Sequence, residues 1–352
     1  MRKKLIFYCF ISCFVVLSPF VRSQETRYAG AFLELGIGAR GIGMGEAFVS
    51  IVDDGSAFYW NPAGASTVLR AEVSGMYAAL FKGLANHYYL GFTRPLSGSS
   101  AISINWVRLS VPKIPQYDSA LLNDPNSSYD TRVAEAGEDP NGFWNQFALT
   151  DQPLSFSNSN DDALFVTLAK EIKWDLDFGW QYFVIPITIP LGVNVKLIRQ
   201  SVFENKGSGI GFDLGGMFKF GLDDLLNDNR LGKFSFGLAV KDIWKTKITW
   251  NTDSRHSDSI DRSWHFGMSY MQPLPSMSGQ LLLGYSYVDQ ITTHHNFGFE
   301  YLYFNRLAVR FGLKDGKFSA GVGLNVSRFR FDYAFRTHSL GGSHRINTAL
   351  TL

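Results

Sequence analysis

The hydrophobic pattern of this chain has a period of two over most of its length. In the segment Phe329–Phe335, apolar side chains alternate with Arg330, Asp332 and Ala334. Successive side chains on a strand point to opposite faces, so this pattern predicts a strand with one apolar face and one polar or small face. Segments of about ten residues with this pattern recur between turn residues, which is typical of transmembrane barrel strands. The predicted strands lie at 70–80, 85–95, 100–110, 162–171, 187–200, 208–220, 233–243, 262–271, 279–288, 294–304, 306–314, 317–326, 329–336 and 342–352.

This alternation fits two architectures. A soluble β-sandwich would bury the aromatic face, whereas a membrane barrel would place the aromatics in lipid and the charges in a wet lumen. The pattern continues strand after strand with little helix between, which favours the barrel. The small residues on the polar face, Gly298, Gly312, Gly321 and Gly323, also suit a crowded lumen, because glycine weakens a strand unless another backbone approaches closely. We therefore predict an all-β, antiparallel transmembrane barrel of about 14 strands.

The N-terminus predicts export. Arg2, Lys3 and Lys4 precede a short apolar run, Leu5–Leu17, and a small residue at Ser23. This order is that of a secretory signal peptide, predicted to comprise residues 1–23 and to be cleaved after Ser23. The apolar run is too short for a spanning helix.

Cleavage would change the charge and the cysteine content. It removes four basic residues and no acids, so the formal charge falls from +2 to −2. Without a dense basic face, nucleic-acid binding is disfavoured. Cys9 and Cys13 both lie in the signal peptide, which excludes disulfides, thiol catalysis and cysteine-ligated metal in the mature chain.

One long polar excursion, predicted as a loop at 111–161, interrupts the strand pattern. Long loops belong on the extracellular side of such barrels. This loop is a candidate lid or partner-contact surface, and the alternative is a loop with no partner.

The stretch Gly36–Gly45, "GIGARGIGMG", opens with a G-x-G-x-x-G match, and acids follow at Asp53 and Asp54. A dinucleotide-binding turn would need repeated strand–helix units downstream, and none follow. The glycines instead permit positive φ and close backbone contact, as a segment packed inside a barrel requires. The sequence thus predicts signal peptide 1–23, a lumenal plug at 24–66 and a barrel at 67–352.

The residues from Phe32 to Ser66 resemble the N-terminal signature of the PorV/PorQ family of outer-membrane proteins, which is related to the FadL long-chain fatty-acid transporter. The matching positions are Gly36, Gly38, Ala39 and Arg40, then Gly43, Met44 and Gly45, then Asp53 and Asp54, and finally Trp60, Asn61 and Pro62 in "WNPAG". The C-terminal "FDYAFRTHSLGGSHRINTALTL" is similar to the closing strands of the family.

This resemblance implies a plugged, FadL-like barrel in the outer membrane of a Gram-negative, Bacteroidetes-like bacterium. It further implies a part in type IX protein secretion or surface attachment. The expected partners are outer-membrane lipids, other type IX components and the C-terminal signal domains of secreted proteins.

Charged residues at predicted lumen-facing positions cluster in the last five strands. The first interpretation is an internal salt-bridge network that holds the plug, with Arg40 pairing a lumen acid; the second is a polar conduit or docking surface. Trp60 is expected to pack against the barrel wall, or alternatively to contact a ligand. The predicted lumen-facing charges are Glu300, Arg310, Arg328, Arg330, Asp332, Arg336 and Arg345.

No G-x-S-x-G, H-E-x-x-H or Walker sequence is present, and the histidines show no metal-ligand spacing, so we expect no enzyme and no cofactor. The leading hypothesis is a non-enzymatic PorV-type barrel serving type IX secretion. The alternatives are a FadL-like channel for fatty acids or other hydrophobic small molecules, and a structural barrel with no cargo.

Overall fold

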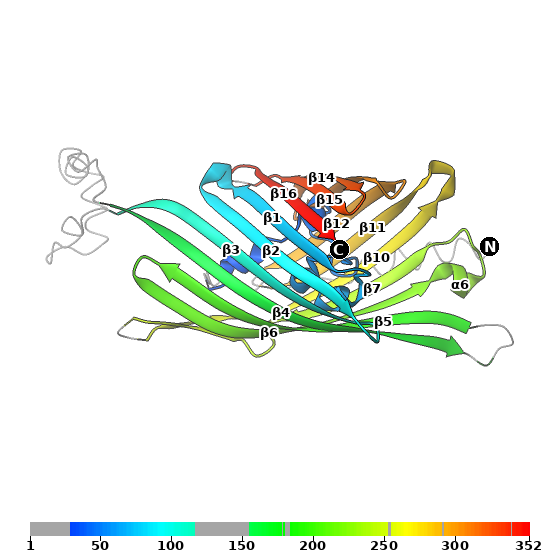
Figure 1. Ribbon diagram of the computed structural model, residues 1–352, viewed down its shortest axis with the longest axis horizontal. Coiled ribbons are helices and arrows are strands. Elements are labelled where there is room, and N and C mark those ends of the chain that lie inside the picture. The colour runs from blue at the N-terminus through cyan, green and yellow to red at the C-terminus, as the bar shows by residue number, and fades with distance from the viewer. Residues whose placement is uncertain are drawn as a thin grey trace.

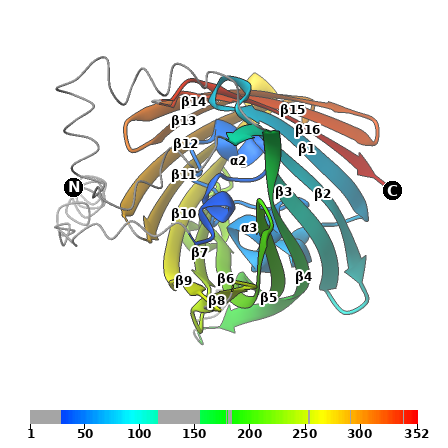
Figure 2. The same ribbon diagram turned by 90° about the vertical axis from the view of Figure 1, so that its left-hand side faces the viewer.

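The computed structural model describes residues 29–116, 155–177, 179, 184–252, 255–290, 292–338 and 340–352. Within them the chain forms an antiparallel sheet that closes on itself (Figures 1 and 2). Consecutive strands pair, β1 closes on β16, and only β8 and β9 are inserted between β7 and β10. The closed ring in the described residues has fourteen strands, which confirms the predicted barrel and rules out the sandwich.

The strands of the ring match the fourteen predicted segments. They are β1 (Glu72–Leu80), β2 (Ala85–Leu96), β3 (Ser100–Gln116), β4 (Ser155–Asp177), β5 (Val184–Val202), β6 (Asn205–Gly221), β7 (Lys233–Lys241), β10 (Ser263–Leu274), β11 (Gly279–Asp289), β12 (Thr293–Tyr303), β13 (Leu307–Lys314), β14 (Lys317–Val326), β15 (Phe329–Arg336) and β16 (Ser343–Thr351).

Burial along the strands is inverted relative to a soluble protein. Phe311 and Phe331 are 47% and 46% exposed, whereas Arg310 and Asp332 on the same strands are each 3% exposed. The aromatic face therefore points out of the barrel and the charged face points in. A lipid bilayer requires both features. The apolar side chains contact the lipid, and the closed sheet gives every backbone group of the strands a partner. In the described residues, no helix is long and apolar enough to cross a membrane.

The N-terminal segment Ala29–Thr67 lies inside the barrel and is here called the plug (Figure 2). Its helix α2 faces strands β13 to β16, and its turn η2 faces strands β2 to β6. The short helices of the plug are η1 (Ala31–Glu34), α2 (Ala39–Gly43), α3 (Ala57–Trp60) and η2 (Pro62–Thr67); those between strands are η3 (Phe81–Gly83), α6 (Leu222–Leu226) and η5 (Pro275–Met277).

The two ends of the barrel differ. Strand β3 runs to Gln116 and β4 begins at Ser155, so the longest connection lies at the end where these strands meet. Long connections mark the extracellular end of such barrels, and the opposite end, with the β4–β5 connection, is then periplasmic. The predicted signal peptide, residues 24–28 of the predicted plug and residues 117–154 lie outside the described residues.

The predicted loop boundaries at 111–161 are wrong at both ends. Residues 111–116 and 155–161 belong to β3 and β4, and Val111 pairs with Ser159 before a bulge. The side chains of these two segments do not alternate between apolar and polar. Backbone pairing then continues without the alternation that identified the other strands.

A small hairpin, formed by β8 and β9, was not predicted from the sequence. Strands β8 (Thr246–Trp250) and β9 (Ser257–Ile260) pair with each other, and β8 also pairs with β6 at Gly207–Gly209. Ile248 is fully buried against Gly207 and Gly209, so the hairpin continues the wall beside β6. Strands of four or five residues carry too few positions to show alternation.

Candidate functional site

Glycines set the path of the plug. Gly38 begins α2 with φ 79°, and Gly45 leaves it with φ 64°, both in the left-handed region that favours glycine. At Gly45 the wall is also close, because a Cβ there would lie 2.5 Å from the backbone nitrogen of Leu313. The glycine-rich motif thus serves chain direction and backbone contact, as the sequence predicted.

An ion-pair chain ties the plug to β12, β13 and β15. The guanidinium of Arg40 donates to both carboxylate oxygens of Glu300, at 2.9 and 2.8 Å, and also pairs with Asp53. Arg310 donates to Glu300 and, at 2.7 Å, to Asp332. The fork of Arg40 suits a carboxylate, and the predicted pairing of Arg40 with a lumen acid is present.

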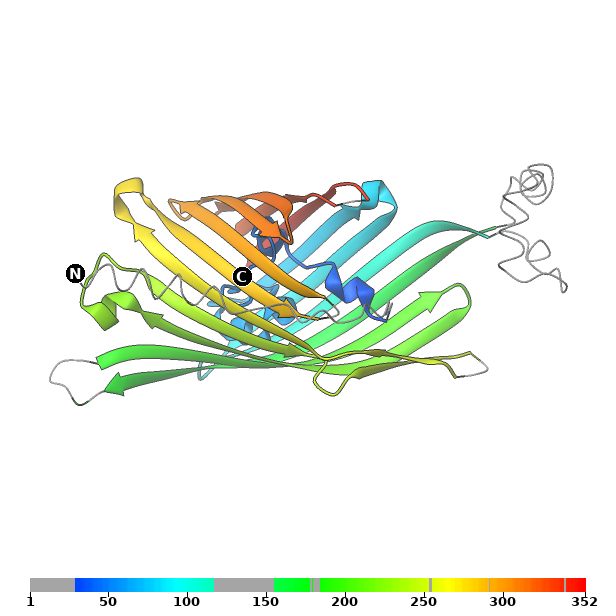
Figure 3. The same ribbon diagram turned by 180° about the vertical axis from the view of Figure 1, so that it is seen from behind.

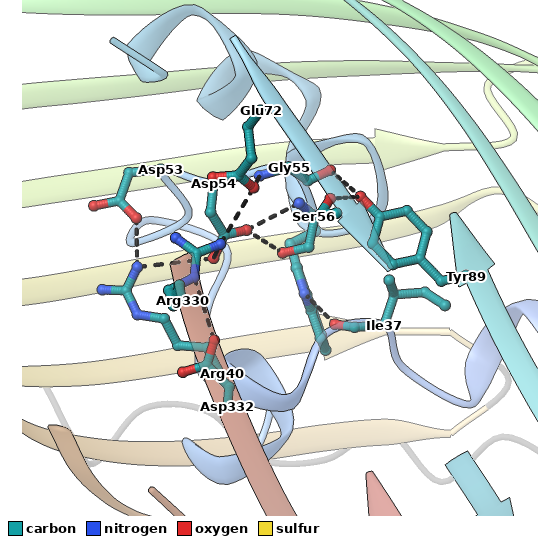
Figure 4. A network of polar contacts seen from close by, with 12 residues as sticks. Ile37, Arg40, Asp53, Asp54, Gly55, Ser56, Glu72, Tyr89, Arg330 and Asp332 are labelled. Atoms are coloured by element: carbon teal, nitrogen blue, oxygen red, sulfur yellow. Dashed lines mark hydrogen bonds and ion pairs between the residues drawn. The ribbon is translucent and has the colours of Figure 1, made fainter. Parts of the chain in front are cut away.

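A second branch joins the plug to β1 and β15 (Figure 4). Arg330 lies 3.2 Å from a carboxylate oxygen of Glu72, 3.8 Å from one of Asp54 and 3.2 Å from one of Asp332. Glu72 in turn accepts a hydrogen bond of 3.0 Å from the backbone N–H of Gly55. Burial raises the pKa of Asp54, but the nearby Arg330 and Arg40 outweigh it and lower that pKa. Asp54 is therefore held charged inside the barrel.

Glu46 forms a third anchor, with Lys314 at 2.7 Å and with Arg336. Burial raises the pKa of Glu46, but these two cations bring it down to about 2, against an ordinary value of 4.5. A carboxyl whose pKa is lowered by folding stabilises the fold fully above its unfolded pKa, and this contribution is lost as the pH falls toward the folded pKa.

This predicts a pH-dependent variant effect. At about pH 7, Glu46→Gln should have a lower melting temperature in detergent than the wild type. The pKa difference corresponds to a loss in the free energy of unfolding of the order of 3 kcal/mol. The difference should shrink as the pH falls from 4.5 toward 2, because wild-type Glu46 is then protonated too. A difference that stays constant over this range would contradict the assigned ion pairs.

Not every predicted lumen charge is in the lumen. Arg345 is fully buried and donates to the backbone oxygen of Leu35 in the plug, at 2.6 Å. Arg328, however, is exposed in the turn between β14 and β15, and the prediction for it is wrong. The turn takes Ser327 and Arg328 out of the strand, so the alternation does not extend to Arg328.

The motif Trp60-Asn61-Pro62 holds the plug together and fixes it to the wall. The indole N–H of Trp60 donates to the backbone oxygen of Ile37, at 2.9 Å, and its ring lies edge-on to Phe48, so Trp60 packs within the plug. The predicted packing of Trp60 against the wall stays a prediction. The side-chain amide of Asn61 donates to the backbone oxygens of Val49 and of Gly216 on β6, at 3.0 and 3.1 Å. Asn61 also accepts a hydrogen bond from the start of η2.

An arc of inward-facing glycines, here called the glycine collar, lies against the plug. A Cβ on Gly312 would lie 2.0 Å from the backbone nitrogen of Gly45, and one on Gly237 would lie 2.5 Å from the oxygen of Val49. Within the collar, Gly284 pairs across strands with Gly298, which pairs with Gly312. A side chain at Gly215 would meet the side chains of Asn61 and Pro62, and one at any other collar position would meet plug backbone. The collar consists of Gly192, Gly215, Gly237, Gly267, Gly284, Gly298, Gly312 and Gly321, on eight successive strands of the ring.

The sequence analysis missed a buried cluster on the opposite wall. Lys196 on β5 lies 2.8 Å from Asp213 and 2.7 Å from Asp242. Asn194, two residues earlier, donates to the backbone oxygen of Phe58 in the plug at 2.7 Å. The sequence does carry a signal for this cluster, because Asn194 and Lys196 occupy alternate positions within the otherwise apolar run from Ile189 to Ile198.

Two spaces adjoin the plug. One is a cavity of about 50 Å³ inside the barrel, lined by charged groups that include Glu46, Lys196 and Lys241. The other, here called the wall hollow, is a hollow of about 370 Å³ across β6, β7, β10 and β11. It is lined by Gly216, Met217, Phe218, Phe236, Gly237, Leu238, Phe266, Gly267, Met268 and Tyr285.

The wall hollow and the plug meet at the collar. Gly237 and Gly267 line the hollow, and their inner sides touch Val49 and Ser50 of the plug. A single layer of backbone therefore separates the apolar outer surface from the plug at this place.

Comparison with known proteins gives structural likenesses only. No protein-family model matches the chain, and no curated protein matches it. Among solved structures, the toluene transporter TodX of Pseudomonas putida is 9% identical with a TM-score of 0.48, and the alignment covers 90% of this chain and 99% of that one. The monoaromatic hydrocarbon channel CymD is 8% identical, with a TM-score of 0.44 and coverage of 90% and 98%.

A FadL homologue of Pseudomonas aeruginosa is 8% identical with a TM-score of 0.42, and the alignment covers 89% of this chain and 98% of that one. At such identities and TM-scores, these likenesses decide nothing about ligand or partner. Any function assigned to this chain therefore has to be argued from its own geometry.

Proposed function

We propose that this chain is a plugged, non-enzymatic channel of the Gram-negative outer membrane that carries hydrophobic small molecules. The wall hollow is the observation that supports this proposal. It lies on the lipid-facing side, and its side chains are aromatic or aliphatic, led by Phe218, Phe236 and Phe266. An apolar solute that partitions into the bilayer would meet here an apolar hollow whose glycines, Gly237 and Gly267, touch the plug on their inner side.

The plug is placed to control this route. Asn61 donates to the backbone oxygen of Gly216 at 3.1 Å and lies 3.4 Å from that of Leu238, so it bridges β6 and β7 behind the hollow. The cavity beside the plug is small and charged, and it offers no room for such a solute in this state. Passage would therefore require the plug to move away from Gly237 and Gly267.

A matched pair of substitutions tests the proposal. Gly216 on β6 and Gly75 on β1 both face outward, and a Cβ on either would meet other atoms no closer than 3.5 Å. Gly216→Trp should fill the wall hollow and reduce uptake of a labelled aromatic hydrocarbon about tenfold, the loss that about 1.4 kcal/mol of barrier would cause. Gly75→Trp, which adds the same indole far from the hollow, should transport like the wild type.

Equal uptake by both variants and the wild type would contradict a route through the wall hollow.

The type IX role implied by the sequence resemblance stays a prediction, and it does not require the wall hollow. Gly216→Trp should therefore leave secretion of substrates with C-terminal signal domains unchanged. A secretion defect without a change in uptake would favour the type IX role.

A further inference from the structure

The β4–β5 hairpin extends beyond its neighbours at the periplasmic end (Figures 1 and 3). Strand β3 starts at Ser100, which pairs with Lys170 of β4. Strand β4 continues to Asp177, and β5 pairs with it throughout this extension, to Val184. In the described part of the chain, the residues from Ile172 to Asp177 thus have a strand on one side only.

The backbone groups on the open side can be assigned. The N–H of Glu171 donates to the backbone oxygen of Ser99, at 2.8 Å, so Glu171 points toward the β3 side. Backbone groups of successive strand residues point to opposite sides, and the β4–β5 register is continuous here. The N–H and C=O groups of Lys173 and Asp175 therefore face the open edge, while those of Trp174 face β5.

The side chains give this edge a definite chemistry. Ile172 and Trp174 are 43% and 63% exposed on one face. On the other face, Lys173 pairs with Glu171 at 3.2 Å, which leaves Asp175 as an exposed acid next to the open backbone groups. The odd-numbered residues of β4 face inward, as buried Ala169 shows, so Lys173 and Asp175 are inward charges. The edge has no bulge, and with these charges its open backbone groups can pair only with a strand of complementary charge.

We propose that this edge binds an extended segment of a periplasmic protein, in which apolar residues alternate with basic ones. Such a segment would add a strand to β4, with main-chain hydrogen bonds for affinity and its basic residues opposite Asp175. A second copy of this chain is a poor occupant. Barrels in one membrane share an orientation, and an antiparallel pair of β4 strands would need one barrel to be inverted.

The probe is a fluorescent peptide of alternating valine and lysine, titrated against the full-length protein in nanodiscs. We expect binding with a Kd in the micromolar range, as for weak peptide interfaces. Asp175→Pro removes an edge N–H without touching the β4–β5 ladder, and it should weaken binding about tenfold or more. Asp175→Ala keeps the N–H and loses only the charge, so it should weaken binding less.

Three results would overturn the proposal. They are no binding to the wild type, equal binding to the wild type and Asp175→Pro, and equal binding of a peptide that alternates valine with glutamate. Dimers of the wild type that Asp175→Pro abolishes would assign the edge to a second copy instead. Heat-dependent gel mobility shows that each variant is a folded barrel.

Discussion

Replacing Gly312 with valine is expected to unseat the plug while the barrel stays closed. The new Cβ would lie 2.0 Å from the nitrogen of Gly45 and 2.3 Å from the carbonyl carbon of Met44, which are backbone atoms without a rotamer to change. Overpacking of this kind costs about 1–3 kcal/mol or more. The wall itself should tolerate valine, a β-branched residue suited to strands.

The measurement is ion conductance in planar bilayers. The wild type should stay closed, and Gly312→Val should conduct, because a fourteen-stranded barrel without its plug encloses a wide polar lumen. Gly75→Val is the control, since Gly75 faces outward and has no plug atom within reach. A closed Gly312→Val barrel with unchanged heat-dependent gel mobility would show that the collar does not seat the plug.

Arg40→Ala is expected to give the largest loss of stability among charge substitutions. This substitution removes the guanidinium that pairs with both Glu300 and Asp53, and Glu300 is only 3% exposed. Breaking a buried ion pair from one side costs about 3–5 kcal/mol. Glu300 keeps Arg310 as a partner, so the expected loss is at the lower end of this range. The thermal melt of the purified protein in detergent should shift down accordingly.

A double-mutant cycle isolates the pair. Arg40→Ala combined with Glu300→Gln should cost less than the sum of the two single variants, because each single variant already removes the interaction between the two side chains. Arg40→Lys should recover only part of the stability, since an ammonium cannot form both hydrogen bonds of the fork. Additive effects would mean that Arg40 and Glu300 do not hold the plug together.

Much of the barrel was predictable because lipid and lumen impose opposite demands on neighbouring residues. Phe331 and Asp332 show this contrast, and each predicted strand within the membrane was found. The prediction failed where that contrast ends. Residues 155–161 form strand although nearly all of their side chains are polar, and Arg328 lies in a turn, so neither follows the alternation.

The sequence identified individual residues of the plug but not the barrel residues that they contact. Arg40, the glycine motif and Trp60-Asn61-Pro62 could be singled out from local sequence. Which acid Arg40 meets depends on barrel register, and Glu300 is 260 residues away. Only part of the collar could be predicted, because the strand pattern placed Gly298, Gly312 and Gly321 on the lumen face. The collar glycines of β5 to β11 share a role only because their strands lie side by side in the barrel.

Hydrogen exchange of the wild-type protein in nanodiscs tests the central claim most directly, namely that the plug is seated in the barrel at the glycine collar. Helices as short as α2, with five residues, do not persist on their own, so slow exchange there requires seating. The account predicts that amides from Gly41 to Val52 exchange as slowly as those of the barrel strands. Exchange of these amides within seconds, with the strands still protected, would contradict it.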